Sequence, residues 1–314
     1  MKVYKSLDEI GNIPNPVITI GTFDGVHLGH QKIISQINEE AKAIGGESVL
    51  FSFFPHPRMV LYPDSHGLKL IQTQDEKLKK LEVLGLHNLI EFPFTYEFSR
   101  LTALEFVRDI LFNKLNVKRL VIGYDHQFGK NREGTIAFLQ SVAVTYDFEV
   151  IQIPAEVIND INISSTKIRT AIKQGDMLSA NAFLGDAFNL QGVVVEGNRL
   201  GRTIGFPTAN IGQISNIKLL PARGVYAVQV ILEGKRYNGM VNLGFRPTVV
   251  TEGMEIVEVH IFDFNEDIYG KVLILNFYQR IREEKKFDNL EQLKQQLMSD
   301  EKEIRTLFAS FADQ

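Results

Sequence analysis

The first half of the chain alternates between two patterns of hydrophobic positions. Short apolar runs bounded by turn residues are typical of buried strands. They cover residues 16–21, 48–55, 88–94, 119–125 and 149–154. Between them, apolar residues recur at helical spacing over residues 30–44, 75–86, 102–115 and 134–146. This alternation predicts an α/β fold, a doubly wound, Rossmann-like parallel sheet with helices on both faces.

The pattern changes near residue 185. Two further helical segments, residues 165–175 and 176–185, close the first half. Strand-like runs with turn signals and no helical pattern between them then follow, at residues 188–198, 224–244 and 255–281. They predict a mostly antiparallel β-barrel, followed by a terminal helix that Asp288 and Glu291 cap. We expect two domains, residues 1–185 and 186–314.

Composition narrows the class of protein. The 314 residues are 44% hydrophobic, enough for a sizeable core in each domain. The net charge of -4 argues against a general nucleic-acid or membrane-surface binder. The chain has no cysteine, which excludes disulfides, thiolate metal sites and a cysteine nucleophile. No apolar run approaches the roughly 18 residues of a membrane span, and the first residues do not form a secretory signal. We therefore expect a cytoplasmic protein, and the sequence names no protein partner.

Two histidines lie where the first strand gives way to a helix, in GTFDGVHLGHQKII (residues 21–34). His27 and His30 are open to three interpretations: incidental turn residues, a metal pair, or part of a nucleotide site. A metal pair would lack the HExxH arrangement and a third ligand nearby. Ligands of doubly wound sheets bind where a strand ends and a helix N-terminus attracts anions. We favour the nucleotide site, in which phosphates would raise both histidine pKa values from about 6.5 so that each carries positive charge.

Glycines in the same stretch strengthen that interpretation. Gly21, Gly25 and Gly29 would let phosphates approach the backbone closely. Phe23 and Asp24 complete the predicted nucleotide-binding loop.

A second phosphate-binding segment is predicted at residues 163–169, ISSTKIR. Ser164, Ser165 and Thr166 suit a helix N-cap, and Lys167 and Arg169 supply cations for the phosphates of the leaving pyrophosphate. Alone, this segment could equally be a capped helix with a solvated basic face. Together with HxGH, it resembles the nucleotidylyltransferase superfamily, whose members move the AMP of ATP onto an acceptor.

Two loops are candidates for the acceptor site. GYDHQFGKN (residues 123–131) has one residue too many between its glycines for a P-loop, and Asn131 replaces the Ser or Thr that would hold magnesium. We expect Phe128 to stack on a flat ring and Asp125 to accept a hydrogen bond. The segment resembles the FG motif of the same family, with His126 where an aromatic residue is usual. FFPHPR (residues 53–58) resembles the family's PHP segment and places His56 at the flavin, although a rigid turn would explain it equally.

The second half resembles riboflavin kinase. The segments that carry the resemblance are GFPTAN (205–210), NLGFRPTV (242–249), VEVHIFDF (257–264), DIYG (267–270) and RIREEKKFDNLEQL (280–293). The whole chain thus resembles the bacterial bifunctional riboflavin kinases/FAD synthetases. The resemblance implies phosphorylation of riboflavin to FMN and transfer of AMP from ATP to FMN, giving FAD and pyrophosphate, with Mg²⁺ as cofactor.

The resemblance also assigns residues in this half. Glu258 matches the catalytic glutamate, although a strand glutamate usually faces solvent. Thr208 and Asn210 match the residues that hold Mg²⁺ and the ATP phosphates, and Gly201 lies in the same nucleotide-binding segment. Arg282 lies in the flavin-side loop, where a surface arginine is nearly as plausible.

Two alternatives remain. HxGH with a basic serine-rich motif also resembles class I aminoacyl-tRNA synthetases, but the acidic charge balance and the lack of zinc ligands weigh against them. A non-catalytic flavin sensor would keep both pockets, and only an assay of flavin products separates it from an enzyme.

Overall fold

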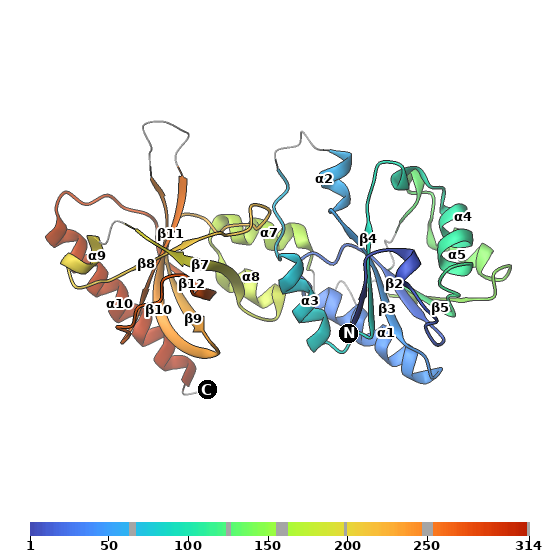
Figure 1. Ribbon diagram of the computed structural model, residues 1–314, viewed down its shortest axis with the longest axis horizontal. Helices are drawn as coiled ribbons and strands as arrows, with labels where there is room; N and C mark the ends of the chain where they lie inside the picture. Colours follow the sequence, from blue (N-terminus) through green and yellow to red (C-terminus); the bar gives the residue numbers. More distant parts are fainter. Residues whose placement is uncertain (63–66, 124–126, 155–162, 198–199, 247–253, 313–314) are drawn as a thin grey trace. The chain divides into compact units, whose positions relative to one another are not determined.

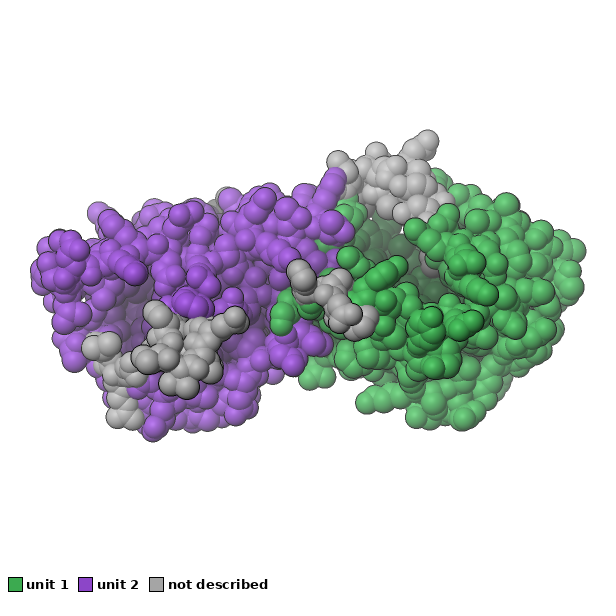
Figure 2. Space-filling model, turned by 90° about the horizontal axis from the view of Figure 1, so that it is seen from above, with its two compact units in different colours: residues 1–165 green, residues 166–314 purple. Residues whose placement is uncertain are grey.

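The computed structural model describes residues 1–62, 67–123, 127–154, 163–197, 200–246 and 254–312. The chain forms two compact units, Met1–Ser165 and Thr166–Gln314, coloured separately in Figure 2. The sequence placed the domain boundary two helices later, at residue 185, and that boundary stays a prediction. Among the described residues, no helix is both long and apolar enough to span a bilayer.

A six-stranded parallel sheet forms the centre of the first unit, with the order β1-β4-β3-β2-β5-β6. Its strands are β1 (Lys2–Tyr4), β2 (Val17–Ile20), β3 (Ser48–Phe54), β4 (Asn88–Pro93), β5 (Arg119–Gly123) and β6 (Glu149–Ile153). The predicted strands are confirmed, whereas β1 was missed because three largely exposed residues leave no hydrophobic pattern. The chain runs outward from β2 to β4 on one side and from β5 to β6 on the other. The carboxyl end of β2 is therefore the topological switch point, where such sheets bind ligands.

Helices cover both faces of this sheet, as predicted (Figure 1). The helices of this unit are α1 (Leu28–Ala43), α2 (Pro57–Leu61), α3 (Gln74–Val83), α4 (Ala103–Glu105), a π-helical segment η3 (Phe106–Phe112) and α5 (Ile136–Ala143). Short 3₁₀ turns lie at η1 (Leu7–Glu9), η2 (Phe98–Arg100) and η4 (Lys130–Arg132). Val17 packs under α1 and α3, whereas its neighbour Ile18 packs under η3 and α5. Successive strand residues point to opposite faces, so a near-continuous apolar strand serves both cores.

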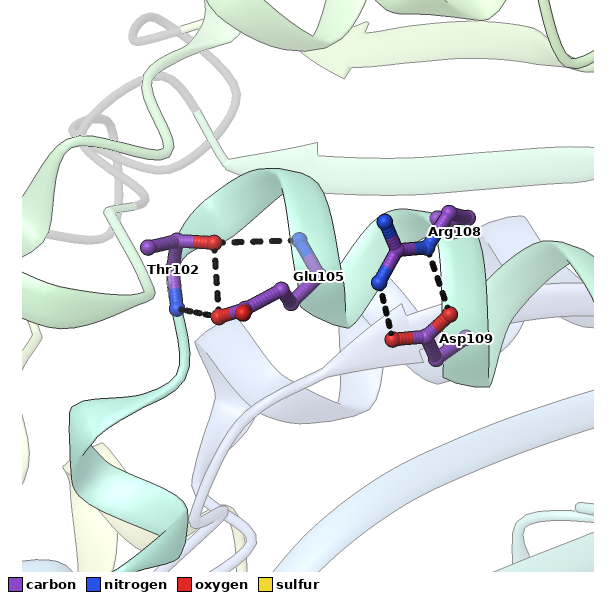
Figure 3. Close-up of polar contacts among 4 residues, drawn as sticks. All are labelled: Thr102, Glu105, Arg108 and Asp109. Carbon is purple, nitrogen blue, oxygen red and sulfur yellow. Dashed lines mark hydrogen bonds and ion pairs between the residues drawn. The ribbon is translucent and has the colours of Figure 1, made fainter.

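The helical segment over one face starts at a reciprocal cap (Figure 3). The Thr102 hydroxyl accepts from the Glu105 amide at 3.2 Å, and the Glu105 carboxylate accepts from the Thr102 amide at 2.9 Å. Further on, Arg108 and Asp109 form an exposed bidentate pair with distances of 2.6 and 2.7 Å. Exposed pairs stabilise little, so the cap and the buried Phe106 hold this segment in place.

The second unit is a closed antiparallel barrel of β10-β11-β8-β7-β12-β9, which confirms the predicted barrel. Its strands are β7 (Phe188–Val195), β8 (Ala209–Gly212), β9 (Gly224–Leu232), β10 (Lys235–Arg246), β11 (Met254–Ile261) and β12 (Val272–Arg282). β9 and β10 are joined by Glu233 and Gly234, both with positive φ (50° and 81°), as a tight hairpin turn requires. β8 was missed because its four residues follow a loop rich in turn signals.

The helices of this unit are α7 (Ser165–Gln174), α8 (Met177–Leu184), α9 (Leu200–Thr203) and α10 (Leu290–Ala312). α10 buries Ile304 and Phe308 against Met240 of the barrel. The predicted cap at Asp288 is wrong by one residue: Asn289 Oδ1 accepts from the Gln292 amide at 2.9 Å, and the helix begins at Leu290.

Candidate functional site

The two predicted histidines lie together at the carboxyl end of β2. His27 is the N-cap of α1, and its Nδ1 accepts a hydrogen bond of 3.4 Å from the His30 amide. The two imidazoles stack with their centroids 3.7 Å apart, and Phe23 stacks on the other side of His30 at 4.4 Å. The structure therefore brings Phe23, His30 and His27 into one aromatic stack at the helix N-terminus.

The loop that carries this stack has a strained backbone. Phe23 has φ of 50° and Val26 has φ of 35°, values that non-glycine residues rarely adopt and β-branched residues adopt least. Such strain persists only where surrounding contacts over-determine the backbone, and it is concentrated at functional sites.

The glycines of the loop make room for its own side chains. A Cβ at Gly21 would lie 2.8 Å from the Phe23 ring, and a Cβ at Gly29 would lie 3.3 Å from the His27 ring. Gly25 has φ of 91°, which favours glycine. The sequence interpretation, in which the glycines let phosphates approach the backbone, is not tested by these contacts. That the loop binds the nucleotide stays a prediction.

Both histidines are neutral in this structure. Burial lowers the pKa of His27 to about 4, and burial together with the neighbouring His27 holds the pKa of His30 well below its usual value. The cationic imidazoles of the sequence interpretation depend on bound phosphates, so that charge stays a prediction. Because His27 Nδ1 accepts a hydrogen bond, its proton is on Nε2, which remains a donor. His30 Nδ1 is buried without a hydrogen-bond partner in the described structure.

The positive charge near the imidazoles comes from lysines that the sequence interpretation missed. Lys77 and Lys80 lie on α3, and their charges lower the pKa of His30. The Lys77 side chain is only 5% exposed, and its ammonium donates to the Thr22 carbonyl at 2.7 Å and to Ser52 Oγ at 2.6 Å. The available signal was positional: Lys77 precedes the buried Leu81 by one helical turn and so shares its face.

Asp24 of the loop forms hydrogen bonds with residues 71 and 72 and with Ser165. The Asp24 carboxylate accepts from the Ile71 amide at 3.0 Å and from the Gln72 amide at 3.4 Å. Ser165 Oγ donates to the Asp24 carbonyl at 2.9 Å, which brings the predicted second phosphate motif to the first.

The rest of that motif follows in α7. Ser164 directly precedes the helix, as expected of a cap. Thr166, Lys167 and Arg169 are in its first turns, within the second unit. Their contact with ATP stays a prediction.

The predicted flavin residues fall in two places. Phe128 is half-buried and packs on Phe106 with centroids 5.4 Å apart, in a cluster of phenylalanines that includes residues of β3 and β4. The other members of the cluster are Phe51, Phe53, Phe92, Phe94 and Phe98. His56 caps α2, with Nδ1 accepting from the Arg58 amide at 3.2 Å, so it has a local structural role. Asp125 and His126 lie outside the described residues, and flavin binding stays a prediction.

In the second unit, Glu258 lies between two asparagines on neighbouring strands. It is directly paired with Asn210 of β8 on one side and with Asn242 of β10 on the other. Opposed residues of antiparallel strands share a face, so the three side chains form one row. All three are half-buried, whereas Val257 and Val259 are buried on the opposite face. Glu258 is half-buried, its catalytic role stays a prediction, and Asn242 is a neighbour that sequence reasoning did not single out.

A cleft of about 440 Å³ lies within the second unit, and it borders Ala209 and Val259, on the face of these strands opposite Glu258 and Asn210. Its lining includes Arg202, Thr208, Glu266 and Tyr269. His260 Nδ1 lies 2.7 Å from the Pro207 carbonyl, a contact that holds the exposed Thr208 at the rim.

Gly201 precedes this segment and faces the Phe206 backbone. A Cβ at Gly201 would collide with the Phe206 carbonyl, and the Phe206 amide donates to the Gly201 carbonyl at 2.8 Å. The glycine is therefore needed for the turn itself, and its contact with a nucleotide stays a prediction.

Arg282 is held by a buried partner. Its Nε donates to Asp300 of α10 at 2.8 and 3.1 Å, and Asp300 is 1% exposed. The guanidinium therefore joins β12 to α10. Arg282 is thus not the unattached surface arginine of the alternative interpretation. Its role in flavin binding stays a prediction.

Comparison with known proteins covers both units. The family model of FAD synthetase matches residues 11–167, and that of riboflavin kinase matches residues 184–308. A bifunctional riboflavin kinase/FMN adenylyltransferase of Bacillus subtilis is 37% identical over 298 residues, 94% of this chain and 93% of the relative. A protein of the same description from Escherichia coli K12 is 35% identical over 311 residues, 98% of each chain.

A solved structure agrees with the fold. A protein of Streptococcus pneumoniae, described as a macrolide-efflux protein, has a TM-score of 0.86 and 35% identity, and the match covers 96% of this chain and 98% of that one. The two family models together with the near full-length relatives show that this chain belongs to the family of bifunctional riboflavin kinases/FMN adenylyltransferases.

Proposed function

We propose that the chain makes FAD in two ATP-dependent steps, one in each unit. The barrel unit phosphorylates riboflavin to FMN, and the sheet unit transfers AMP from ATP to FMN. The observation that carries this proposal is the presence of both family matches on one chain, each over a unit with its own constellation of polar residues.

For the kinase step, we assign Glu258 as the general base. The ribityl hydroxyl oxygen attacks the γ-phosphorus of ATP, its proton passes to the Glu258 carboxylate, and the bond from the γ-phosphorus to the β,γ-bridging oxygen breaks to release ADP. The pairing of Glu258 with Asn210 supports this assignment, because the carboxylate lies directly opposite the residue that we propose as a phosphate ligand. The 440 Å³ cleft at Thr208 is of the size that holds a small-molecule ligand.

The oxygen atoms of Thr208 and Asn210 are of the kind that binds Mg²⁺. The Thr208 hydroxyl and the Asn210 amide are hard oxygen donors, and Mg²⁺ is usually held by one or two protein groups together with substrate phosphates. We propose that Thr208 and Asn210 hold the ion. When bound, it offsets the negative charge of the ATP phosphates.

The adenylyl step needs no general base, because the FMN phosphate is already an anion. A phosphate oxygen of FMN attacks the α-phosphorus of ATP, and the bond from the α-phosphorus to the α,β-bridging oxygen breaks to release pyrophosphate. The site must bring two anions together and stabilise the charge that develops. We assign His27 and His30 as neutral hydrogen-bond donors at this centre. Lys77 and Lys80 supply positive charge, and the predicted Lys167 and Arg169 contact the leaving pyrophosphate.

The test is incubation of the purified chain with riboflavin, ATP and Mg²⁺, followed by chromatography of the flavins. The proposal requires FAD to accumulate from riboflavin and also from supplied FMN. Unchanged riboflavin would favour the flavin sensor, and pyrophosphate exchange that depends on an amino acid would favour the synthetase alternative. The cytoplasmic location and the absence of nucleic-acid partners stay predictions from the sequence.

A further inference from the structure

Lys77 is a buried ammonium group that the predicted motifs do not include. It lies on α3, while its acceptors belong to two other elements: the Thr22 carbonyl of the loop after β2, at 2.7 Å, and Ser52 Oγ of β3, at 2.6 Å. Ser52 Oγ is itself 3.4 Å from the Thr22 carbonyl. One ammonium thus joins a helix, a strand and the loop that carries the histidines.

The carbonyl that Lys77 holds belongs to the peptide group that precedes the strained Phe23. Fixing this peptide plane fixes the start of the positive-φ turn, and the Phe23 ring then stacks on His30 at 4.4 Å. His30 in turn stacks on His27 at 3.7 Å. A continuous path of contacts therefore runs from Lys77 to both imidazoles.

Burying a charged ammonium group costs free energy unless hydrogen bonds and opposite charge offset the loss of water. Lys77 forms no ion pair of 4 Å or less in the part of the chain that the structure describes. The charged and titratable groups that act on it are Asp24 of the loop, Glu91 of β4 and His30 of α1. Burial outweighs the two carboxylates and lowers the pKa of Lys77 to about 8. The protein therefore keeps a positive charge beside a helix N-terminus and two neutral donors, an arrangement that suits an anion.

We propose that Lys77 is a positioning residue for adenylyl transfer: its ammonium group holds the Thr22 carbonyl, and through it the strained turn that carries His27 and His30, and it keeps a positive charge beside both imidazoles. The inference rests on the proposed FAD synthesis. It assigns Lys77 no contact with the substrate.

The proposal predicts an alkaline limit on FAD formation. With a pKa of about 8, Lys77 loses its charge above that pH. We expect the rate of FAD formation from FMN to fall there, while FMN formation from riboflavin does not share this limit. Loss of folded protein at high pH through titration of Lys77 would not explain a fall in the rate of FAD formation. Because the pKa of Lys77 is lower in the folded chain than its usual 10.5, the contribution of this group to the free energy of unfolding rises between pH 8 and 10.5.

The experiment compares wild type, Lys77→Met, Lys77→Arg and the control Lys79→Met between pH 6.5 and 9.5. Lys79 is exposed on the same helix, so its replacement should change neither activity. Lys77→Met should lower kcat for FAD formation by about 100-fold, as misplacement of catalytic groups by about 1 Å does. KM for FMN should stay within a few-fold, and the alkaline limb should disappear. Lys77→Arg keeps its charge at all these pH values, so it should restore much of the rate without the limb.

FMN formation by the same preparations and circular dichroism report folding. If Lys77→Met fails to fold, the pH profiles of wild type and Lys77→Arg still decide the matter. A wild-type profile without an alkaline limb, or a Lys77→Met variant as fast as wild type, would overturn the inference. A wild-type chain that makes no FAD at any pH would instead overturn the proposed function.

Discussion

Glu258 and Asn210 occupy directly opposed positions on the antiparallel strands β11 and β8. Opposed side chains share a face of the sheet with their Cβ atoms about 4.5–5.5 Å apart, so the register of the two strands sets their spacing. β8 has four residues, and among the described residues it pairs with β11 at Ala209 and Asn210. The proposed base is therefore positioned against Asn210, the proposed phosphate ligand, by very few backbone pairs.

Replacement of Glu258 by Gln should abolish FMN formation and spare FAD formation from supplied FMN. The amide keeps the shape of the carboxylate but does not accept the ribityl proton, and a positioned base contributes about 100- to 10,000-fold. Flavin chromatography on the two substrates separately measures both activities. Glu255→Gln, an exposed change on the same strand, is the control that should leave both rates as they are. Equal damage to both activities by Glu258→Gln would contradict the division of labour between the units.

Gly197→Ala should slow the kinase without replacing any residue assigned to it. A Cβ at Gly197 would lie 2.5 Å from Asn210 Cγ, so the amide must move away. A side-chain amide can rotate, so we expect the chain to fold and Asn210 to be misplaced. Displacement of a ligand by about 1 Å costs on the order of 100-fold in rate. Gly11→Ala is the matched control, because no atom lies within 4 Å of that Cβ. A Gly197→Ala variant with unchanged KM for ATP and unchanged kcat would show that Asn210 does not hold the phosphates or the ion.

Long helices and strands were predictable from the sequence because their buried residues form unbroken runs or regular stripes. Buried runs such as Val17–Ile20 and the stripe of α1 leave an unambiguous hydrophobic pattern, and the parallel sheet and the barrel follow from their order. Short elements left no such pattern. β1 and β8 have three and four residues and form by pairing with neighbouring strands, whereas the five residues of α2 are too few for a helical stripe.

The sequence predicted several residues of the candidate site, but it did not predict how burial changes their pKa values. The sequence identified His27 and His30 and predicted that bound phosphates make them cationic, whereas only the folded structure reveals that burial lowers both pKa values. Lys77 was missed for a related reason. A lysine in a helix of charged residues usually faces solvent, and only its register with Leu81 hinted at burial.

His30→Ala should reduce FAD formation by about 100- to 1,000-fold, the usual cost of losing one well-aimed donor, while FMN formation continues. The change also removes a ring from the stack between Phe23 and His27, so a second variant is needed. His30→Phe keeps an aromatic ring and removes both nitrogens. Steady-state rates of FAD formation should fall to a similar extent in the two variants. Activity retained by His30→Phe would mean that His30 acts by stacking alone.

Acid should destabilise the first unit through His27. Its pKa is about 4 in the folded chain and 6.5 as a free side chain, so between these values the unfolded state binds the proton and the folded state does not. The contribution of His27 is complete above pH 6.5 and is lost as the pH falls toward 4. At about 1.36 kcal/mol per unit of pKa difference, the free energy of unfolding should fall by about 3 kcal/mol over this range. His27→Asn removes the titration and keeps a favourable N-cap, so urea denaturation at pH 7.5 and 4.5 should show a smaller loss in the variant than in wild type. The unfolding transition of the second unit, followed in the same samples, should respond to pH alike in both chains. Equal acid losses in the first unit of wild type and variant would mean that the buried imidazole is not the group that titrates.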